Sequence, residues 1–201
     1  MATKTKTPKA DTVLVLRTCA ADMTAYNGFK WPEMGPVDCP DWSDDYECGH
    51  GLRGLLWGEG DGGLLSWTPY AMWLVVEVLA SDIRTGQGAL VGKCKFPRGT
   101  VVYCGTRYGA AEYIGARSVN RAICGGTATA GDAGTATAGY AGTIDIKWWS
   151  GTRYRKVIGY VGEDGILPNV AYRCEAGKLV PVDPAKAAEV AAKIAAEGNR
   201  D

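Results

Sequence analysis

The residue types that could carry chemistry gather in one glycine-rich segment, residues 48–63, which reads CGHGLRGLLWGEGDGG. Its side chains could supply a nucleophile, an acid–base group and a charge stabiliser: Cys48, His50, Arg53, Glu59 and Asp61. Closely spaced glycines also let backbone N–H groups face a phosphate. Residues 49–54 have the glycine spacing of a dinucleotide-binding loop, but they follow proline and aspartate residues rather than a strand. We therefore predict no catalytic residue and keep a small nucleotide-processing enzyme as an alternative.

Histidine and cysteine content limits the remaining chemistry. His50 is the single histidine, so a multi-histidine metal site is excluded and a catalytic triad could use only this residue. The seven cysteines include no CxxC pair, and the spacing of Cys39, Cys48 and His50 fits no standard zinc pattern. We expect mostly free, buried thiols in a reducing compartment, with no metal and no cofactor.

Charge and hydropathy restrict the partners. The chain has 22 Lys+Arg against 22 Asp+Glu, a balance that argues against general nucleic-acid binding. Residues 1–10 are polar and basic, without the apolar stretch of a signal peptide. The longest apolar run, residues 71–80, is too short to span a bilayer and contains Glu77. We expect a cytoplasmic protein without membrane association.

A tandem repeat is the clearest architectural signal. Residues 126–133 read GTATAGDA, residues 134–141 read GTATAGYA, and a third unit begins at Gly142. A degenerate unit over residues 118–125 precedes them. Each TATA is a period-2 strand followed by a corner, so two octads make a 16-residue coil with alanine inside and threonine outside. About two coils result, and such a short β-solenoid must be capped or must self-associate, so we expect a homo-oligomer.

The outward threonines admit three interpretations. Regular Thr-x-Thr rows resemble ice-binding surfaces, but two coils offer little area for that role. Thr129, Thr137 and Tyr140 could instead line a ligand groove at a subunit junction. The interpretation we favour is that threonine is simply a good exposed strand residue.

The whole pattern predicts a mainly β protein, with an α+β N-terminal part, a short two-arm β-solenoid, β-hairpins and a C-terminal helix. Strands are expected at 12–17, 70–80, 89–95 and 100–104, a short helix at 107–114, hairpins at 144–161 and 171–182, and a helix at 183–197 capped by Asp183. The predicted organisation is a disordered basic tail (1–11), a mixed β-rich domain (12–117), the octad β-solenoid (118–143), a β-hairpin cap (144–182) and an alanine-rich helix (183–201).

Basic and aromatic residues suggest a binding surface. Arg153, Arg155 and Lys156 follow Trp148 and Trp149, an arrangement suited to an anionic planar ligand, although a solvated strand face would look the same. The predicted ligand-binding residues are Arg53, Trp57, Arg107, Arg117, Arg121, Tyr140, Trp149, Arg153 and Arg155.

Several segments together resemble an uncharacterised family of bacteriophage and bacterial proteins: Asn27-Gly28-Phe29, the CGHGLRGLLWGEGD segment, FPRGTVVYCG, the GTATAG octads and GYVGEDGILPNVAYRC. The resemblance covers about residues 12–182. In that family a histidine follows the Gly-Leu pair where this chain has Arg53, so the resemblance implies a phage or mobile-element setting and not a reaction.

That setting, by analogy, implies a non-enzymatic, oligomeric binding protein that acts in the host-cell cytoplasm as an inhibitor or ligand sponge against a host defence system. The expected partners are a second copy of the chain and either a host protein or an anionic, nucleotide-like small molecule. A structural or assembly protein that oligomerises through the solenoid is a further alternative.

Overall fold

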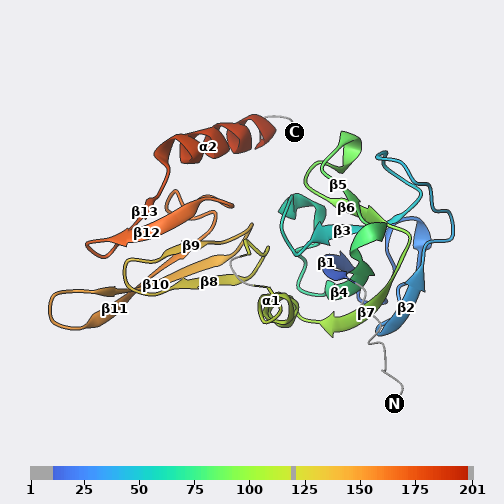
Figure 1. Ribbon diagram of the computed structural model, residues 1–201, viewed down its shortest axis with the longest axis horizontal. Helices are drawn as coiled ribbons and strands as arrows, with labels where there is room; N and C mark the ends of the chain where they lie inside the picture. Colours follow the sequence, from blue (N-terminus) through green and yellow to red (C-terminus); the bar gives the residue numbers. More distant parts are fainter. Residues whose placement is uncertain (1–10, 119–120, 199–201) are drawn as a thin grey trace, which may run out of the picture.

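Seven antiparallel strands of the N-terminal body form one sheet in the order β2-β7-β4-β1-β3-β6-β5 in the computed structural model, which describes residues 11–118 and 121–198 (Figure 1). The strands are β1 (Thr12–Cys19), β2 (Gly35–Asp38), β3 (Leu52–Leu56), β4 (Met72–Leu79), β5 (Arg84–Thr85), β6 (Cys94–Phe96) and β7 (Arg98–Gly105). Four short 3-10 helices interrupt them: η1 (Tyr26–Gly28), η2 (Gly62–Leu64), η3 (Ala80–Asp82) and η4 (Gly88–Leu90).

The centre of this sheet is the pair β1–β4, which stays in register from Thr12↔Leu79 to Cys19↔Met72. Both strands are apolar on both sides, as expected for strands covered on two faces. One core contains Val15, Leu74 and Phe96, and the other contains Leu14, Leu16 and Val75. The second core is closed by helix α1.

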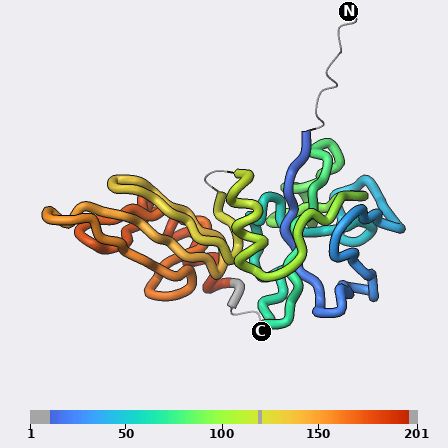
Figure 2. Tube along the Cα trace, turned by 90° about the horizontal axis from the view of Figure 1, so that it is seen from below, coloured from blue at the N-terminus to red at the C-terminus, as the bar shows by residue number. Residues whose placement is uncertain are grey.

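Helix α1 (Arg107–Gly115) lies between the two bodies of the molecule in both views (Figures 1 and 2). Thr106 caps it, since its hydroxyl accepts a hydrogen bond from the backbone N–H of Gly109 (3.2 Å). Its buried residues Ala110, Ala111 and Ile114 pack against the sheet. The predicted helix at 107–114 is confirmed.

The predicted strand at residues 89–95 is wrong. Residues 88–90 form η4, and β6 begins only at Cys94. The reason is local, because Gly86, Gly88 and Gly92 all have positive φ, which extended strand backbone does not accommodate. The apolar Leu90 is buried by a turn rather than by a strand.

The C-terminal body consists of two three-stranded sheets, β11-β10-β8 and β13-β12-β9. Its elements are β8 (Thr127–Ala130), β9 (Thr135–Thr137), β10 (Thr143–Trp149), β11 (Tyr154–Tyr160), β12 (Ala171–Glu175), β13 (Lys178–Pro181) and helix α2 (Pro184–Gly198). A core between the sheets includes Ala136, Ile144, Ile146 and Tyr172. The two expected hairpins and the mainly β fold class are thus confirmed.

The octads form the expected 16-residue coil. Strands β8 and β10 pair in parallel, with Thr127 beside Thr143 and Ala130 beside Ile146, so the chain returns to the same place after 16 residues. Strand β9 is the opposite arm of that coil. Besides this complete coil there is one further arm, β10, and the solenoid ends there because the chain after Trp149 turns back into β11, as expected for the hairpin at 144–161.

Each corner of the coil is a tight turn with the same geometry. The N–H groups of Gly126, Gly134 and Gly142 donate to the carbonyl oxygens of Ile123, Gly131 and Gly139, three residues earlier (3.0–3.1 Å). The residue before each donor has positive φ: Gly125 (72°), Ala133 (57°) and Ala141 (50°). The octad period is therefore a period of turns as well as of strands.

Helix α2 lies beside the β13-β12-β9 sheet (Figure 1). The Asp183 carboxylate accepts hydrogen bonds from the N–H groups of Ala185 and Lys186 (3.0 and 3.1 Å), which is the expected N-cap. Ala187 and Val190 pack on the core of the C-terminal body. Of the helices within the described ranges, none has the length and apolar character needed to cross a membrane.

Three expectations concern residues outside the described ranges: the disordered tail, for residues 1–10, the degenerate octad, for Val119 and Asn120, and the alanine-rich helix, for residues 199–201. The rest of that octad is visible. Residues 122–126 lie beneath residues 138–142, one coil earlier, since a Cβ on Gly139 would lie 2.4 Å from the Ala122 carbonyl oxygen.

Candidate functional site

The sheet β11-β10-β8 turns one side to solvent, and we call this side the outer face. The alternation predicted for the octads is confirmed on it, because Thr127 and Thr129 are exposed while Ala128 and Ala130 are half-buried toward the core. The outward side chains are Thr127 and Thr129 of β8, Thr143, Asp145, Lys147 and Trp149 of β10, and Tyr154, Lys156, Ile158 and Tyr160 of β11.

The threonines of the outer face form a regular array. Residues two apart on one strand are roughly 6.6 Å apart, and adjacent strands are about 4.8 Å apart. Thr127 and Thr129 define the first row, and Thr143 lies beside Thr127 in the second. Asp145 occupies the fourth position, where its carboxylate binds the Lys156 ammonium (2.6 Å). The array thus consists of three hydroxyls bordered by an ion pair.

Buried side chains on the inner side of the sheet support the threonine array. Ile144 and Ile146 of β10 are fully buried, and alanines fill the same positions of β8 and β9. Small residues allow the two arms of the coil to lie close together. The opposite arm presents Thr135 and Thr137, beside Arg173 and Ala171 of β12.

Exposed apolar groups border the hydroxyls. Ile158 and Tyr160 of β11 are each about half exposed, at 52% and 53%, and Trp149 packs edge-on against Tyr154 with ring centroids 5.1 Å apart. Lys147 places its ammonium 4.2 Å from the Tyr154 ring. The outer face therefore combines hydroxyls, methyl groups and rings on one sheet.

The predicted ligand-binding residues do not come together. Five of them lie where α1 and the octad corner meet the N-terminal body: Trp57, Arg107, Arg117, Arg121 and Tyr140. Three lie on the β10–β11 hairpin, Trp149, Arg153 and Arg155. Arg53, on β3, lines a cavity of the N-terminal body away from both.

The five residues beside α1 and the octad corner are engaged within the chain. Each of them either packs on an aromatic ring or provides the ring on which an arginine packs. Arg117 lies 3.5 Å over Tyr113, and Arg121 lies 5.2 Å over Trp57 while it binds Glu59 (3.0 Å). The Arg107 guanidinium contacts Trp67 and Tyr108, and Tyr140 packs on Trp67 at 5.3 Å. The contacts of Arg107 with Trp67, Arg121 with Trp57 and Tyr140 with Trp67 connect α1 and the octad corner to the N-terminal body, whereas Arg117–Tyr113 and Arg107–Tyr108 are local to α1.

The hairpin residues do not form one surface. Arg155 lies opposite Trp148 in the β10–β11 register, whereas Trp149 lies opposite Tyr154. Because neighbouring strand residues point to opposite sides, Trp149 and Arg155 lie on opposite faces of the sheet. Trp149 belongs to the outer face, and Arg155 does not.

The acid–base set of residues 48–63 is dispersed. Glu59 binds Arg121 and the N–H of Ala122, and Asp61 caps η2 through the N–H of Gly63. His50 pairs with Asp41 on the surface (3.1 Å). The described residues contain no group of three metal-ligating side chains and no disulfide.

Comparison with known proteins gives one consistent set of relatives. The ice nucleation protein of Pseudomonas fluorescens is 42% identical over 109 residues, which are 53% of this chain and 9% of that protein. The ice nucleation protein of Xanthomonas campestris pv. translucens is 44% identical over 104 residues (52% and 6%), and InaU of Pantoea ananas is 40% identical over 106 residues (53% and 10%). No family model and no solved structure matches the chain.

These relatives correct the resemblance stated above. The relatives are bacterial ice nucleation proteins, so assignment to an uncharacterised phage family is wrong. The function built on it, a counter-defence inhibitor or ligand sponge, is wrong as well, together with nucleotide binding and a location in the host-cell cytoplasm. The two alternatives, an assembly protein and a nucleotide-processing enzyme, have no counterpart in the names of these relatives. About half of this chain is similar to ice nucleation proteins, and the aligned part spans a tenth or less of their length.

Proposed function

We propose that this protein interacts with ice, and that the threonine array on the outer face is the surface that orders water. The observation that carries the proposal is the parallel pairing of β8 with β10, which places Thr127, Thr129 and Thr143 on one exposed side. The names of the relatives support it independently.

The chemistry of the outer face suits this role. Each threonine offers a hydroxyl that donates and accepts hydrogen bonds, next to a methyl group that restricts the orientations of nearby water. The buried isoleucines and alanines hold the hydroxyls at fixed spacings, so water bound at one position is in register with water at the next. Ile158 and Tyr160 extend the surface with apolar groups.

The small area of the threonine array limits the ice-nucleating activity that we expect from one chain. One chain supplies a single coil and one further arm, whereas 109 aligned residues make up only 9% of the Pseudomonas fluorescens relative. A nucleus of ice needs an extended template, so a single copy is expected to act weakly.

We also propose that copies of the chain associate to enlarge the face. Strands β8 and β11 are the two edges of its sheet in the described structure, and an edge strand can pair with a strand of another molecule. A strand added at either edge would continue the outer face. Activity per chain should therefore rise with protein concentration, and light scattering should show the assembled species.

The direct test is droplet freezing with the full chain and two matched variants. Thr129→Lys places a hydrated charge within the array, beside Asp145, and Thr152→Lys makes the same change on an exposed residue of the hairpin turn. We expect wild type and Thr152→Lys to freeze droplets at a warmer median temperature than buffer, and Thr129→Lys to fall back toward buffer.

Circular dichroism and thermal unfolding of the variants show that the fold is retained. The proposal fails if wild type freezes with buffer at every concentration, assembled samples included. It also fails if the folded Thr129→Lys variant freezes droplets as wild type does.

A further inference from the structure

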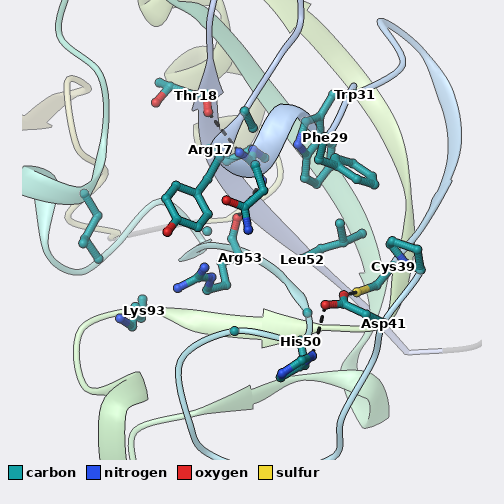
Figure 3. A pocket seen from close by; sticks show the side chains of 18 of the residues that line it. Arg17, Thr18, Phe29, Trp31, Cys39, Asp41, His50, Leu52, Arg53 and Lys93 are labelled. Atoms are coloured by element: carbon teal, nitrogen blue, oxygen red, sulfur yellow. Dashed lines mark hydrogen bonds and ion pairs between the residues drawn. The ribbon is translucent and has the colours of Figure 1, made fainter.

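A cavity of about 600 Å³, shown in Figure 3, opens in the N-terminal body. Its lining contains no residue of the outer face. Strands β1 and β3 supply Arg17 and Arg53, the segment before β6 supplies Lys93, and the chain after η1 supplies Phe29 and Trp31. A cavity of this volume is in the usual range for small-molecule sites.

Arg17 is a half-buried cation, and among the described residues it forms no ion pair with a carboxylate. Its guanidinium stacks on the Trp31 ring at 3.9 Å, and within the described part of the chain its terminal nitrogens donate to the main-chain oxygens of Arg53 (3.3 Å) and Thr18 (3.2 Å). Its Nε is enclosed and has no hydrogen-bond partner. Burial lowers the pKa of Arg17 to about 10; nearby Cys19 partly offsets this, and the positive charge of Arg53 adds to it. Arg17 remains charged at neutral pH.

Two unsatisfied donors lie beside this cavity. Within the described residues, the buried side-chain nitrogens without a partner are Arg17 Nε and Trp31 Nε1, and both residues line the cavity. Leaving such groups unpaired is costly, so the described residues leave the hydrogen-bonding needs of this region unmet.

The charge of the cavity points to an anion. Its lining contains three cations, Arg17, Arg53 and Lys93, and one carboxylate, Asp41. Asp41 is already engaged, since it binds His50 and accepts from the Cys39 thiol (each 3.1 Å). Figure 3 shows Arg17, Arg53 and Lys93 on one side of the cavity and the His50–Asp41 pair on the other.

We propose that this cavity binds a small molecule through a terminal oxyanion, a phosphate or a carboxylate, held by Arg17 and Arg53. Guanidinium groups suit this chemistry because their N–H groups match two oxygens of such an anion. Lys93 adds a third positive charge at the rim, and Phe29 and Trp31 provide an apolar wall for the body of the ligand. This site is independent of the threonine array.

Calorimetric titration of the full chain tests the site with four probes: inorganic phosphate, phenyl phosphate, benzoate and the uncharged benzyl alcohol. We expect phenyl phosphate or benzoate to bind and benzyl alcohol not to bind, and the stronger of the two anions identifies phosphate or carboxylate as the natural group. Affinity should decrease with added salt.

Arg53→Gln is the primary variant, because the Arg53 side chain is half-exposed and, among the described residues, its guanidinium makes no hydrogen bond or ion pair. Loss of a charged donor should weaken anion binding by about tenfold to a hundredfold. The matched control is Arg155→Gln, which removes an exposed cation of β11 and should leave binding unchanged. Both variants should freeze droplets like wild type, so this test is separate from that of the outer face.

Arg17 is followed directly through its Nε–H resonance in an NMR spectrum, which should move when the anion is added. The proposed site would be wrong if neither phenyl phosphate nor benzoate bound at millimolar concentration. Wild-type affinity in Arg53→Gln, an equal loss in Arg155→Gln, or binding that leaves the Arg17 resonance in place would also overturn it.

Discussion

Single residues of this protein owe their chemistry to neighbours that are distant in the sequence. Arg17 is an example, since its contacts Trp31 and Arg53 lie 14 and 36 positions away. In the sequence Arg17 ends an apolar strand and looks like an ordinary boundary residue. The signal that could have found it is the combination of arginines with a tryptophan, but only the strand register brings them together.

The seven thiols illustrate the same point, and their reactivity is a test. The Lys93 ammonium lies 3.1 Å from the Cys48 sulfur and lowers the pKa of this exposed thiol. Burial raises the pKa of Cys94 to about 12 and that of Cys124 to about 11. Since the thiolate is the nucleophile, Cys48 should be alkylated first by iodoacetamide at neutral pH, and Cys94 and Cys124 last.

The pH dependence of alkylation tests the direction of the Cys48 pKa shift. The alkylation rate of Cys48 should rise to its plateau at a lower pH than that of a free thiol, and Lys93→Gln should shift the profile upward. Mass spectrometry of the modified peptides measures each site. Equal rates for Cys48 and Cys94 in the folded chain would contradict this account.

Secondary-structure elements could be predicted wherever neighbouring residues in the sequence determine them. The octads, α1, both hairpins and the Asp183 cap depend on periodicity, turn residues and capping, all of which are contained in a few neighbouring residues. Residues 89–95 were not predictable in this way, because positive-φ glycines override an apolar pattern.

Candidate sites depend more strongly on long-range information. The alternation that separates Trp149 from Arg155 across the β10–β11 pair needs the hairpin register, which the length of the turn sets. The predicted binding residues were chosen for charge and aromaticity, and four of the nine form ring contacts between distant parts of the chain: Trp57, Arg107, Arg121 and Tyr140. The threonine rows were recognised from the sequence but set aside because of their small area.

One turn of the coil places an alanine in a strained backbone conformation, and this can be tested. Ala133 has φ of 57°, which L-residues other than glycine adopt at a cost, whereas Gly125 holds the equivalent place one octad earlier. Ala133→Gly should therefore stabilise the chain by about 0.5–1 kcal/mol.

Urea unfolding measures this difference. The matched control is Ala130→Gly, at the end of β8 where φ is not positive, and this change should destabilise the chain. Equal losses of stability in both variants would show that the turn geometry described for the coil is wrong.

The whole molecule is a short coil fixed between two caps. On one side the octad corner packs on the N-terminal body through Tyr140 and Trp67, and on the other β11 ends the sheet. Strands β8 and β9 fill the interior of the coil with alanines, which keeps these two arms close and the outer threonines regular. This design extends by repetition, since each added 16-residue coil would contribute two outward threonines to the first arm.

The central claim is that ice interaction depends on the area of the threonine array, and lengthening the coil tests it most directly. One, two or four further copies of residues 126–141 are inserted before Gly142, and droplet freezing is measured at equal molar concentration. Control insertions carry lysine at the two outward threonine positions of the first arm. The account predicts a median freezing temperature that rises with each threonine-bearing coil and does not rise with the lysine coils. A freezing temperature that stays constant as coils are added, or that rises equally with the lysine coils, would contradict it.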